Sequence, residues 1–175
     1  MSELGLIQVY TGNGKGKTTA SLGLAFRAAG HGLKVCMIQF MKDNNEYGET
    51  KAAYLLPGFK LVQVGRNEFV DLGDPESIDR ELAQRGWSMA QACISTGEYD
   101  IIILDEINVA IACGLIDVNE VVAFLTGLKE NKTEILLTGR YAPQAIIDIA
   151  HLVTEMREIK HPFNQGIEAR KGIDF

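Results

Sequence analysis

Short apolar runs alternate with longer amphipathic stretches along this chain. The runs at residues 6–10, 35–40, 60–64, 100–104, 134–138 and 152–156 predict strands. The stretches at 18–29, 75–96, 118–128 and 143–150 carry apolar residues at helical spacing and predict helices. Residues 101–104 are all aliphatic, which is typical of a strand buried on both faces of a parallel sheet. The alternation predicts an α/β fold with a mostly parallel sheet and helices on both of its faces.

The spacing within two of these helices also predicts which sides pack on the sheet. Residues three and four positions apart lie on the same face of a helix, so apolar residues at that spacing mark the buried side. In the 18–29 helix, the predicted buried positions are Leu22, Ala25, Phe26 and Ala29. In the 75–96 helix, they are Ile78, Leu82, Met89 and Cys93.

The composition narrows the class of protein. The 175 residues match the size of one domain, so we expect a single domain over 1–175. A net charge of −6 argues against nucleic acid as the main partner, because phosphate neutralisation needs a basic face. The three cysteines form no C-x-x-C pair, which favours reduced thiols. There is no signal peptide and no run long enough to cross a bilayer, so we expect a cytoplasmic protein that does not bind membranes.

The stretch YTGNGKGKTTAS, residues 10–21, carries the main chemical signal. The phosphate-loop template G-x-x-x-x-G-K-[ST] places its last three members on Gly16, Lys17 and Thr18. Its first glycine should then be residue 11, but residue 11 is Thr11 and a glycine follows at Gly12. The loop follows a predicted strand and precedes a predicted helix, which is the context that phosphate binding requires.

Each part of this loop has a physical reason to meet a triphosphate. Glycines let backbone N–H groups approach phosphate oxygens, and the start of the helix adds a positive dipole end. We expect Lys17 to reach the triphosphate as a point charge and the Thr18 hydroxyl to ligate Mg²⁺ or Mn²⁺. The residues expected at the nucleotide are Thr11, Gly12, Asn13, Gly14, Lys15, Gly16, Lys17, Thr18 and Thr19.

The segment IIILDE supplies carboxylates at the end of a buried strand. Asp105 and Glu106 should lie at the carboxyl edge of the sheet beside the loop, where one of them can hold the metal ion directly or through water. A glycine-rich turn or an acidic helix start can occur by chance. Because both signals occur together, in the right order and context, we interpret them as a nucleoside triphosphate site.

Beyond these motifs, the chain resembles the bacterial P-loop ATP:corrinoid adenosyltransferases of cobalamin biosynthesis and salvage. The resemblance runs nearly end to end, through TGNGKGKTT, GHGLKVCMIQFMK, IIILDE, LLTGR and the tail VTEMREIKHPFNQGIEARKGIDF. The tail is the discriminating part, because generic ATPases do not share it. The resemblance implies a P-loop NTPase (RecA-like) architecture.

The resemblance also implies the reaction. Such enzymes transfer the 5′-deoxyadenosyl group of ATP to the Co(I) centre of a reduced corrinoid and release tripolyphosphate. ATP lies reversed in them relative to ordinary P-loop enzymes, and we hypothesise that the shifted glycine after Thr11 belongs to this alteration. The family assigns metal binding to the glutamate of the Asp-Glu pair, so Lys17, Thr18 and Glu106 are the expected catalytic residues.

The resemblance also implies a homodimer and a reduced flavin or flavodoxin-like electron donor. Arg140 follows a predicted strand and so points to the ligand edge of the sheet, where it is a candidate to contact ATP. This sequence departs from the family in two places. The loop after the third strand has GRNEFVDLGD instead of a GFTW motif, which leaves Phe69 as the aromatic candidate against the corrin. Only five residues precede Leu6, so we expect the N-terminal lid of some members to be missing or replaced.

Two other functions stay open from the sequence. A P-loop ATPase that hydrolyses ATP to ADP to drive a protein partner fits the loop and the Asp-Glu strand equally well, with Glu106 activating a water molecule. A nucleotide-binding module without catalysis would bind ATP irrespective of a corrinoid. His161 stays a candidate for the corrinoid site or a structural residue, and Arg27 is interpreted as a solvated helix charge.

Overall fold

The protein is described here by a computed structural model covering residues 5–68 and 70–175. Phe69 lies outside the described residues. The strands form one parallel sheet in the order β3-β2-β4-β5-β1-β6. Their bounds are β1 Ile7–Thr11, β2 Val35–Phe40, β3 Phe59–Val64, β4 Ile101–Asp105, β5 Glu134–Thr138 and β6 Leu152–Glu155.

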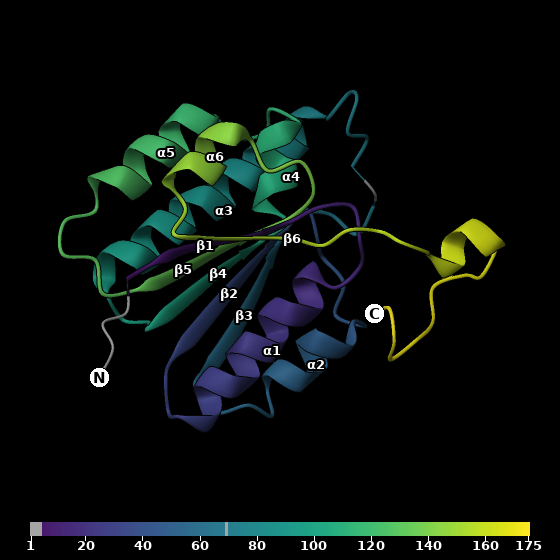
Figure 1. Cartoon of the computed structure of the whole chain (residues 1–175), viewed down its shortest axis with the longest axis horizontal. Coiled ribbons are helices and arrows are strands. Elements are labelled where there is room, and N and C mark those ends of the chain that lie inside the picture. The colour runs from purple at the N-terminus through teal and green to yellow at the C-terminus, as the bar shows by residue number, and fades with distance from the viewer. Residues whose placement is uncertain (1–4, 69) are drawn as a thin grey trace.

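Helices cover both faces of this sheet, as predicted (Figure 1). One face carries α1 and α2, and the other carries α3, α4, α5 and α6. The bounds are α1 Lys17–Gly30, α2 Gly48–Ala53, α3 Ser77–Thr96, α4 Ile107–Ala112, α5 Val118–Gly127 and α6 Gln144–Ile149, with a 3₁₀ helix, η1, at Pro162–Gln165. None of the helices in the described ranges is long and apolar enough to cross a membrane.

The core consists of two apolar layers separated by the sheet. Strands β2, β4 and β5 are buried along their whole length, because they occupy the middle of the sheet with helices on both sides. On the α3 side, Trp87 is fully buried, packs edge-on against Phe124 and donates its indole N–H to Glu120 at 2.7 Å. The phosphate loop follows β1 and Asp105 ends β4, both at the carboxyl ends of the strands of this packed sheet.

Two predicted helix faces are wrong in detail. Phe26 of α1 is 71% exposed rather than buried, while Ala25 and Ala28 pack on the sheet. The buried side of α3 is displaced from the predicted one, since Ile78 is exposed. Its buried residues are Asp79, Ala83, Gly86, Trp87, Ala90 and Ile94. The small residues let α3 lie close to the sheet, and a pattern search that weighs bulk overlooks them.

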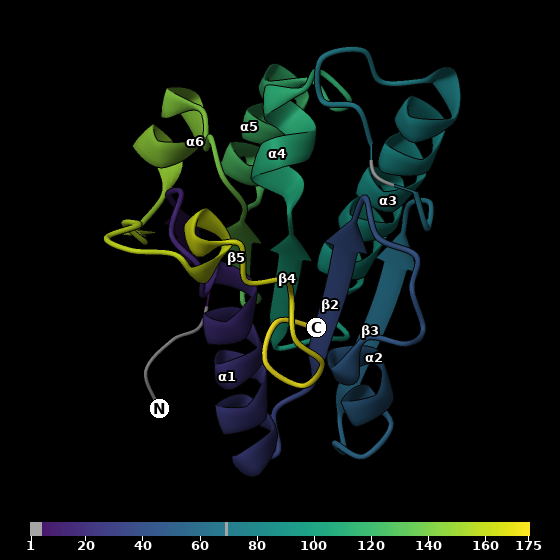
Figure 2. The ribbon, with the colours of Figure 1, turned by 90° about the vertical axis from the view of Figure 1, so that its right-hand side faces the viewer.

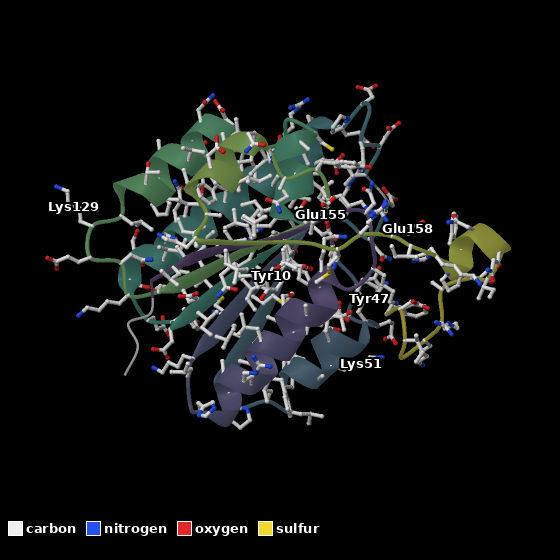
Figure 3. The ribbon with its side chains drawn as sticks, in the orientation of Figure 1. Tyr10, Tyr47, Lys51, Lys129, Glu155 and Glu158 are labelled. Atoms are coloured by element: carbon white, nitrogen blue, oxygen red, sulfur yellow. The ribbon has the colours of Figure 1, made fainter. Side chains whose placement is uncertain are left out.

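After β6 the chain passes across the carboxyl end of the sheet as a tail, residues 156–175. Figure 2 shows this tail in front of β5 and β4, with the C-terminus beside β2 and near α2. Glu155 and Glu158 mark the segment where it leaves the sheet (Figure 3). The tail ends with Phe175, whose ring centroid lies 6.1 Å from that of Tyr47 just before α2. The phosphate loop therefore lies between the sheet and the tail.

Candidate active site

The phosphate loop begins one residue later than the template places it. Thr11 is the last residue of β1, and its carbonyl accepts the amide of Met156 at 2.8 Å in the extension of the β1–β6 pairing. Its hydroxyl accepts the amide of Ala142 at 3.3 Å. Thr11 is therefore a buried strand residue, and the turn starts at Gly12, whose φ is +94°.

The first two glycines of the loop let the tail approach closely. A Cβ on Gly12 would lie 2.5 Å from the Met156 carbonyl oxygen, and one on Gly14 would lie 2.7 Å from the same atom. The Gly14 amide, expected to face phosphate, instead donates to that oxygen at 2.6 Å. The shifted glycine thus has a structural cause: the tail crosses the loop at Met156, and only residues without a side chain leave room for it.

Lys17 begins α1 immediately after Gly16, which takes the left-handed conformation that glycine adopts readily. The Lys17 side chain is buried, and its ammonium donates to the carbonyls of Gly12 and Gly14, at 2.8 Å each. Burial lowers its pKa, partly opposed by the negative charge of Glu106. The loop thus holds the Lys17 ammonium at its centre through two uncharged backbone carbonyls.

Asp105 ends β4 and is fully buried. One carboxylate oxygen accepts the hydroxyls of Thr18 at 2.9 Å and Thr138 at 2.7 Å. The other accepts Lys42 Nζ at 2.8 Å and Gln39 Nε2 at 3.1 Å. Although β5 separates β4 from β1 in the sheet, α1 passes beneath the strands and brings Thr18 to Asp105. With both oxygens occupied, this carboxylate positions the Thr18 hydroxyl.

Glu106 differs from its neighbour in having unused hydrogen-bonding capacity. It precedes α4 in a left-handed conformation, φ +64°, which costs on the order of 1–3 kcal/mol for a residue with a side chain. Across residues 5–68 and 70–175, no hydrogen bond reaches its carboxylate oxygens. Burial, followed by the charge of Asp105, raises its pKa. The backbone thus holds a partly dehydrated carboxylate at the site without a proton donor to satisfy it.

These oxygens fit a hard divalent cation in part. No group of three or more His, Cys, Asp or Glu residues with metal-binding geometry occurs in the described part of the chain. Mg²⁺, however, commonly takes one or two protein ligands and fills its shell with water and substrate phosphates. The Glu106 carboxylate and the Thr18 hydroxyl meet that smaller requirement.

A pocket of about 350 Å³ connects the loop with the tail. Four positively charged side chains line it, from the loop, from the end of β5 and from the tail: Lys15, Lys17, Arg140 and Arg170. Thr18, Thr19 and Glu106 lie on the sheet side, and His161, Pro162, Phe163 and Ile167 on the tail side. Such a concentration of cations in an acidic protein fits a polyanionic ligand.

The tail closes the pocket with an ion-paired cluster. Asp174 pairs with Lys15 of the loop and accepts Arg170 Nε at 3.2 Å and the Arg170 amide at 2.9 Å. Lys15 Nζ also donates to the Ile173 carbonyl at 3.0 Å. These bonds, with that to Lys15 first, lower the pKa of Asp174. Lys15, expected only to carry charge toward solvent or ligand, is therefore the tail's attachment point.

The remaining predicted residues are placed as follows. Arg140 lies exposed on the pocket wall after β5, and His161 lines the same pocket while its Nδ1 accepts the Phe163 amide at 3.2 Å. Arg27 is exposed on α1, as interpreted from the sequence. Asn13 is exposed outside the pocket lining. Phe69, the candidate for the corrin, lies outside the described residues.

Sequence reasoning gave no role to five residues of this site: Gln39, Lys42, Thr138, Arg170 and Asp174. The first three share a signal that could have found them. They are polar residues at, or just beyond, the carboxyl ends of central apolar strands, where α/β folds place their ligands. The other two carry no such signal, because only the path of the tail brings them to the loop.

Comparisons with known proteins find relatives along nearly the whole chain. Residues 3–175 match the family model described as "ATP:corrinoid adenosyltransferase BtuR/CobO/CobP". A corrinoid adenosyltransferase from Sinorhizobium sp. is 40% identical over 99% of this chain and 81% of its own length. The corrinoid adenosyltransferase of Escherichia coli K12 is 37% identical over 99% of this chain and 87% of its own length.

Among solved structures, the flagellar accessory protein FlaH from Methanocaldococcus jannaschii superposes with a TM-score of 0.60. The match covers 87% of this chain and 71% of FlaH at 17% identity, so it bears on the fold alone. It confirms the predicted RecA-like P-loop architecture. The family model and the curated relatives extend over the loop, the Asp-Glu strand and the tail, and this chain belongs to the ATP:corrinoid adenosyltransferase family.

Proposed function

We propose that this enzyme transfers the 5′-deoxyadenosyl group of ATP to the Co(I) centre of a reduced corrinoid and releases tripolyphosphate. The observation that carries the proposal is the pocket between loop and tail, where four cationic side chains lie beside Thr18 and Glu106. Membership of the adenosyltransferase family supplies the reaction, and the pocket supplies the means of holding a triphosphate.

In this reaction the electron pair on Co(I) forms the Co–C5′ bond while the bond between C5′ and the triphosphate oxygen breaks. The electron pair of the broken bond leaves with the triphosphate. Because the corrinoid provides the nucleophile, the protein needs no serine, cysteine or histidine for that purpose. Its tasks are to hold the 5′ carbon in line with cobalt and to stabilise the charge on the leaving group.

The chain's own residues suit these tasks. Lys17 can exchange its two carbonyl partners for phosphate oxygens, which are stronger acceptors because they carry charge. Arg140 adds a charge from the end of β5. Thr18 is held in place by the buried Asp105. We assign the metal ion to Thr18 and Glu106 and the positioning role to Asp105, because the oxygens of Asp105 are already fully used.

Mg²⁺ or Mn²⁺ bound there would neutralise part of the charge of the triphosphate. Thr18 and Glu106 would orient that ion, and Pro162 and Phe163 of the tail form the opposite wall of the pocket. The reversed pose of ATP and contact of Phe69 with the corrin belong to the same proposal. The proposal also includes a homodimeric enzyme, a cytoplasmic location and a reduced flavin or flavodoxin-like electron donor.

Hydrolysis of ATP to ADP is the competing function, with Glu106 activating a water molecule. The family to which the chain belongs does not favour it. An anaerobic assay in dim light with MgATP and chemically reduced corrinoid separates the two. We expect a light-sensitive adenosyl-corrinoid spectrum from the wild type and loss of at least 100-fold in rate from Lys17→Ala, since one charge-assisted contact at a transition state is worth about that factor. An unchanged corrinoid spectrum with the wild type would refute the proposal.

A further inference from the structure

The tail cluster places a carboxylate among the cations of the phosphate pocket. Asp174 bonds to both Lys15 and Arg170, one from the loop and one from the tail. All three residues line the same pocket as Lys17 and Thr18. The Asp174 carboxylate, with two oxygens and one negative charge, lies between two cations. Phosphate groups are commonly bound by cations in the same way.

We propose that Asp174 acts as a stand-in for a phosphate group, and that the triphosphate of ATP displaces it from Lys15 and Arg170. The inference rests on the proposed function for the identity of the ligand. It goes beyond that function by assigning Arg170 as a triphosphate-binding residue and the last residues of the tail as a segment that responds to the triphosphate.

Charge is the first argument. The pocket lining holds four cations and three carboxylates: Lys15, Lys17, Arg140 and Arg170, and Glu106, Glu168 and Asp174. Asp174 pairs with two of these cations, Lys15 and Arg170, so its negative charge offsets part of the positive charge that a triphosphate needs. Removing this one negative charge frees both cationic side chains, Lys15 and Arg170, to bind the phosphates when they arrive.

Exposure is the second argument. The side chains of Lys15 and Asp174 are 42% and 22% exposed, and Arg170 is 55% exposed. Ion pairs in contact with water contribute little to stability, so a multiply charged phosphate can replace this one readily. A buried pair, such as that of Lys42 with Asp105, could not be exchanged in this way.

The path of the tail is the third argument. Upstream, the tail is pinned to the loop by the Gly14–Met156 hydrogen bond and by the strand pairing before it. Downstream of Asp174, the ring of Phe175 lies beside that of Tyr47. Release of the Asp174 carboxylate therefore leaves the tail attached to the loop at Met156.

Calorimetric titration of the full chain with inorganic tripolyphosphate tests the inference. We expect Asp174→Asn to bind tripolyphosphate about three- to tenfold more tightly than wild type, because a competing charge is gone. We expect Arg170→Ala to bind about tenfold more weakly, because a charge-assisted hydrogen bond is lost. Asp148→Asn on α6 and Arg85→Ala on α3 make the same charge changes outside the pocket lining and should leave the affinity unchanged.

Weaker binding by Asp174→Asn would show that Asp174 supports the pocket structurally, and would overturn the inference. So would an unchanged affinity in Arg170→Ala. Titration with adenosine serves as a second probe: it should not distinguish the variants, because it carries no phosphate. If the variants behave as expected while the wild type forms no adenosyl-corrinoid, the triphosphate site stands and the proposed reaction fails. If the wild type forms adenosyl-corrinoid but the variants do not bind tripolyphosphate as expected, the proposed reaction stands and the role of Asp174 fails.

Discussion

Two aspartates hold the phosphate loop, one from each side. Asp105 reaches Thr18 from the sheet, and Asp174 reaches Lys15 from the tail. Asp105 also binds a cation far away in sequence, Lys42, whereas Asp174 also binds Arg170, four residues before it. The two aspartates differ in solvent exposure: the Asp105 side chain is fully buried, whereas the side chains of Asp174 and Lys15 are in contact with solvent.

This difference teaches what each side of the site can do. A buried charge can rearrange only at the cost of leaving its partner unpaired in a medium of low polarity, so the sheet side is a fixed support for Thr18. An exposed pair can exchange partners at little cost, so the tail side can adapt to the ligand. The predictions below test this contrast, beginning with the largest effect.

Removing the buried carboxylate should have the largest effect. In Asp105→Ala, Lys42 loses its partner while it stays mostly buried, and the free energy of unfolding should fall by about 3–5 kcal/mol. Urea denaturation measures this change, with Asp148→Ala as the control on the exposed surface of α6. A loss below 1 kcal/mol, about the value of an exposed pair, would remove the contrast between the two sides.

The crossing of the tail over the loop should rank second. Gly12→Ala places a Cβ 2.5 Å from the Met156 carbonyl at a φ of +94°, so we expect a loss of about 1–3 kcal/mol in the free energy of unfolding and weaker ATP binding. A Cβ added at Gly23 in α1 would meet no atom within 4 Å beyond its chain neighbours and the backbone of its own helix. Gly23→Ala should therefore stabilise the protein by roughly 0.4–1 kcal/mol. If both variants shift stability equally, the close approach at Gly12 has no energetic consequence.

Metal dependence tests the division of roles between the two adjacent carboxylates. We expect the Glu106→Gln variant to fold normally. The factor by which Mg²⁺ increases its affinity for ATP should be about tenfold smaller than in the wild type, because a neutral amide is a poorer ligand for a hard cation. Calorimetric titration with ATP, with and without Mg²⁺, measures that gain. A full Mg²⁺ effect in this variant would move the metal away from Glu106.

The exposed carboxylate should have the smallest effect on stability. Asp174→Asn should leave the melting temperature at pH 7 nearly unchanged. Lys15 lowers the pKa of Asp174, so any stabilisation by this group is present above the ordinary aspartate pKa of 3.8 and disappears as pH falls through the lowered value. Thermal melts of both proteins at neutral and acid pH check this. A large loss of stability at pH 7 would make Asp174 a structural anchor instead of an exchangeable one.

The sequence predicted the strands, the long helices and their arrangement, because periodicity reports burial directly. The short helices α2 and α4 escaped prediction, although α6, which is equally short, was predicted. Lys17, Thr18 and Glu106 were predictable because the loop and the strand bearing them are local motifs. Arg170 and Asp174 were not, because their position depends on where the tail crosses, more than 150 residues after Lys15 in the case of Asp174.

The phosphate product tests the central claim most directly. Phosphorus NMR of an anaerobic reaction with MgATP and reduced corrinoid distinguishes cleavage at the 5′ carbon from cleavage between phosphates. The account predicts one tripolyphosphate for each adenosyl-corrinoid formed, with no ADP above the level of a reaction without enzyme. ADP and phosphate as the enzyme-dependent products would contradict it and would make the protein an ATPase.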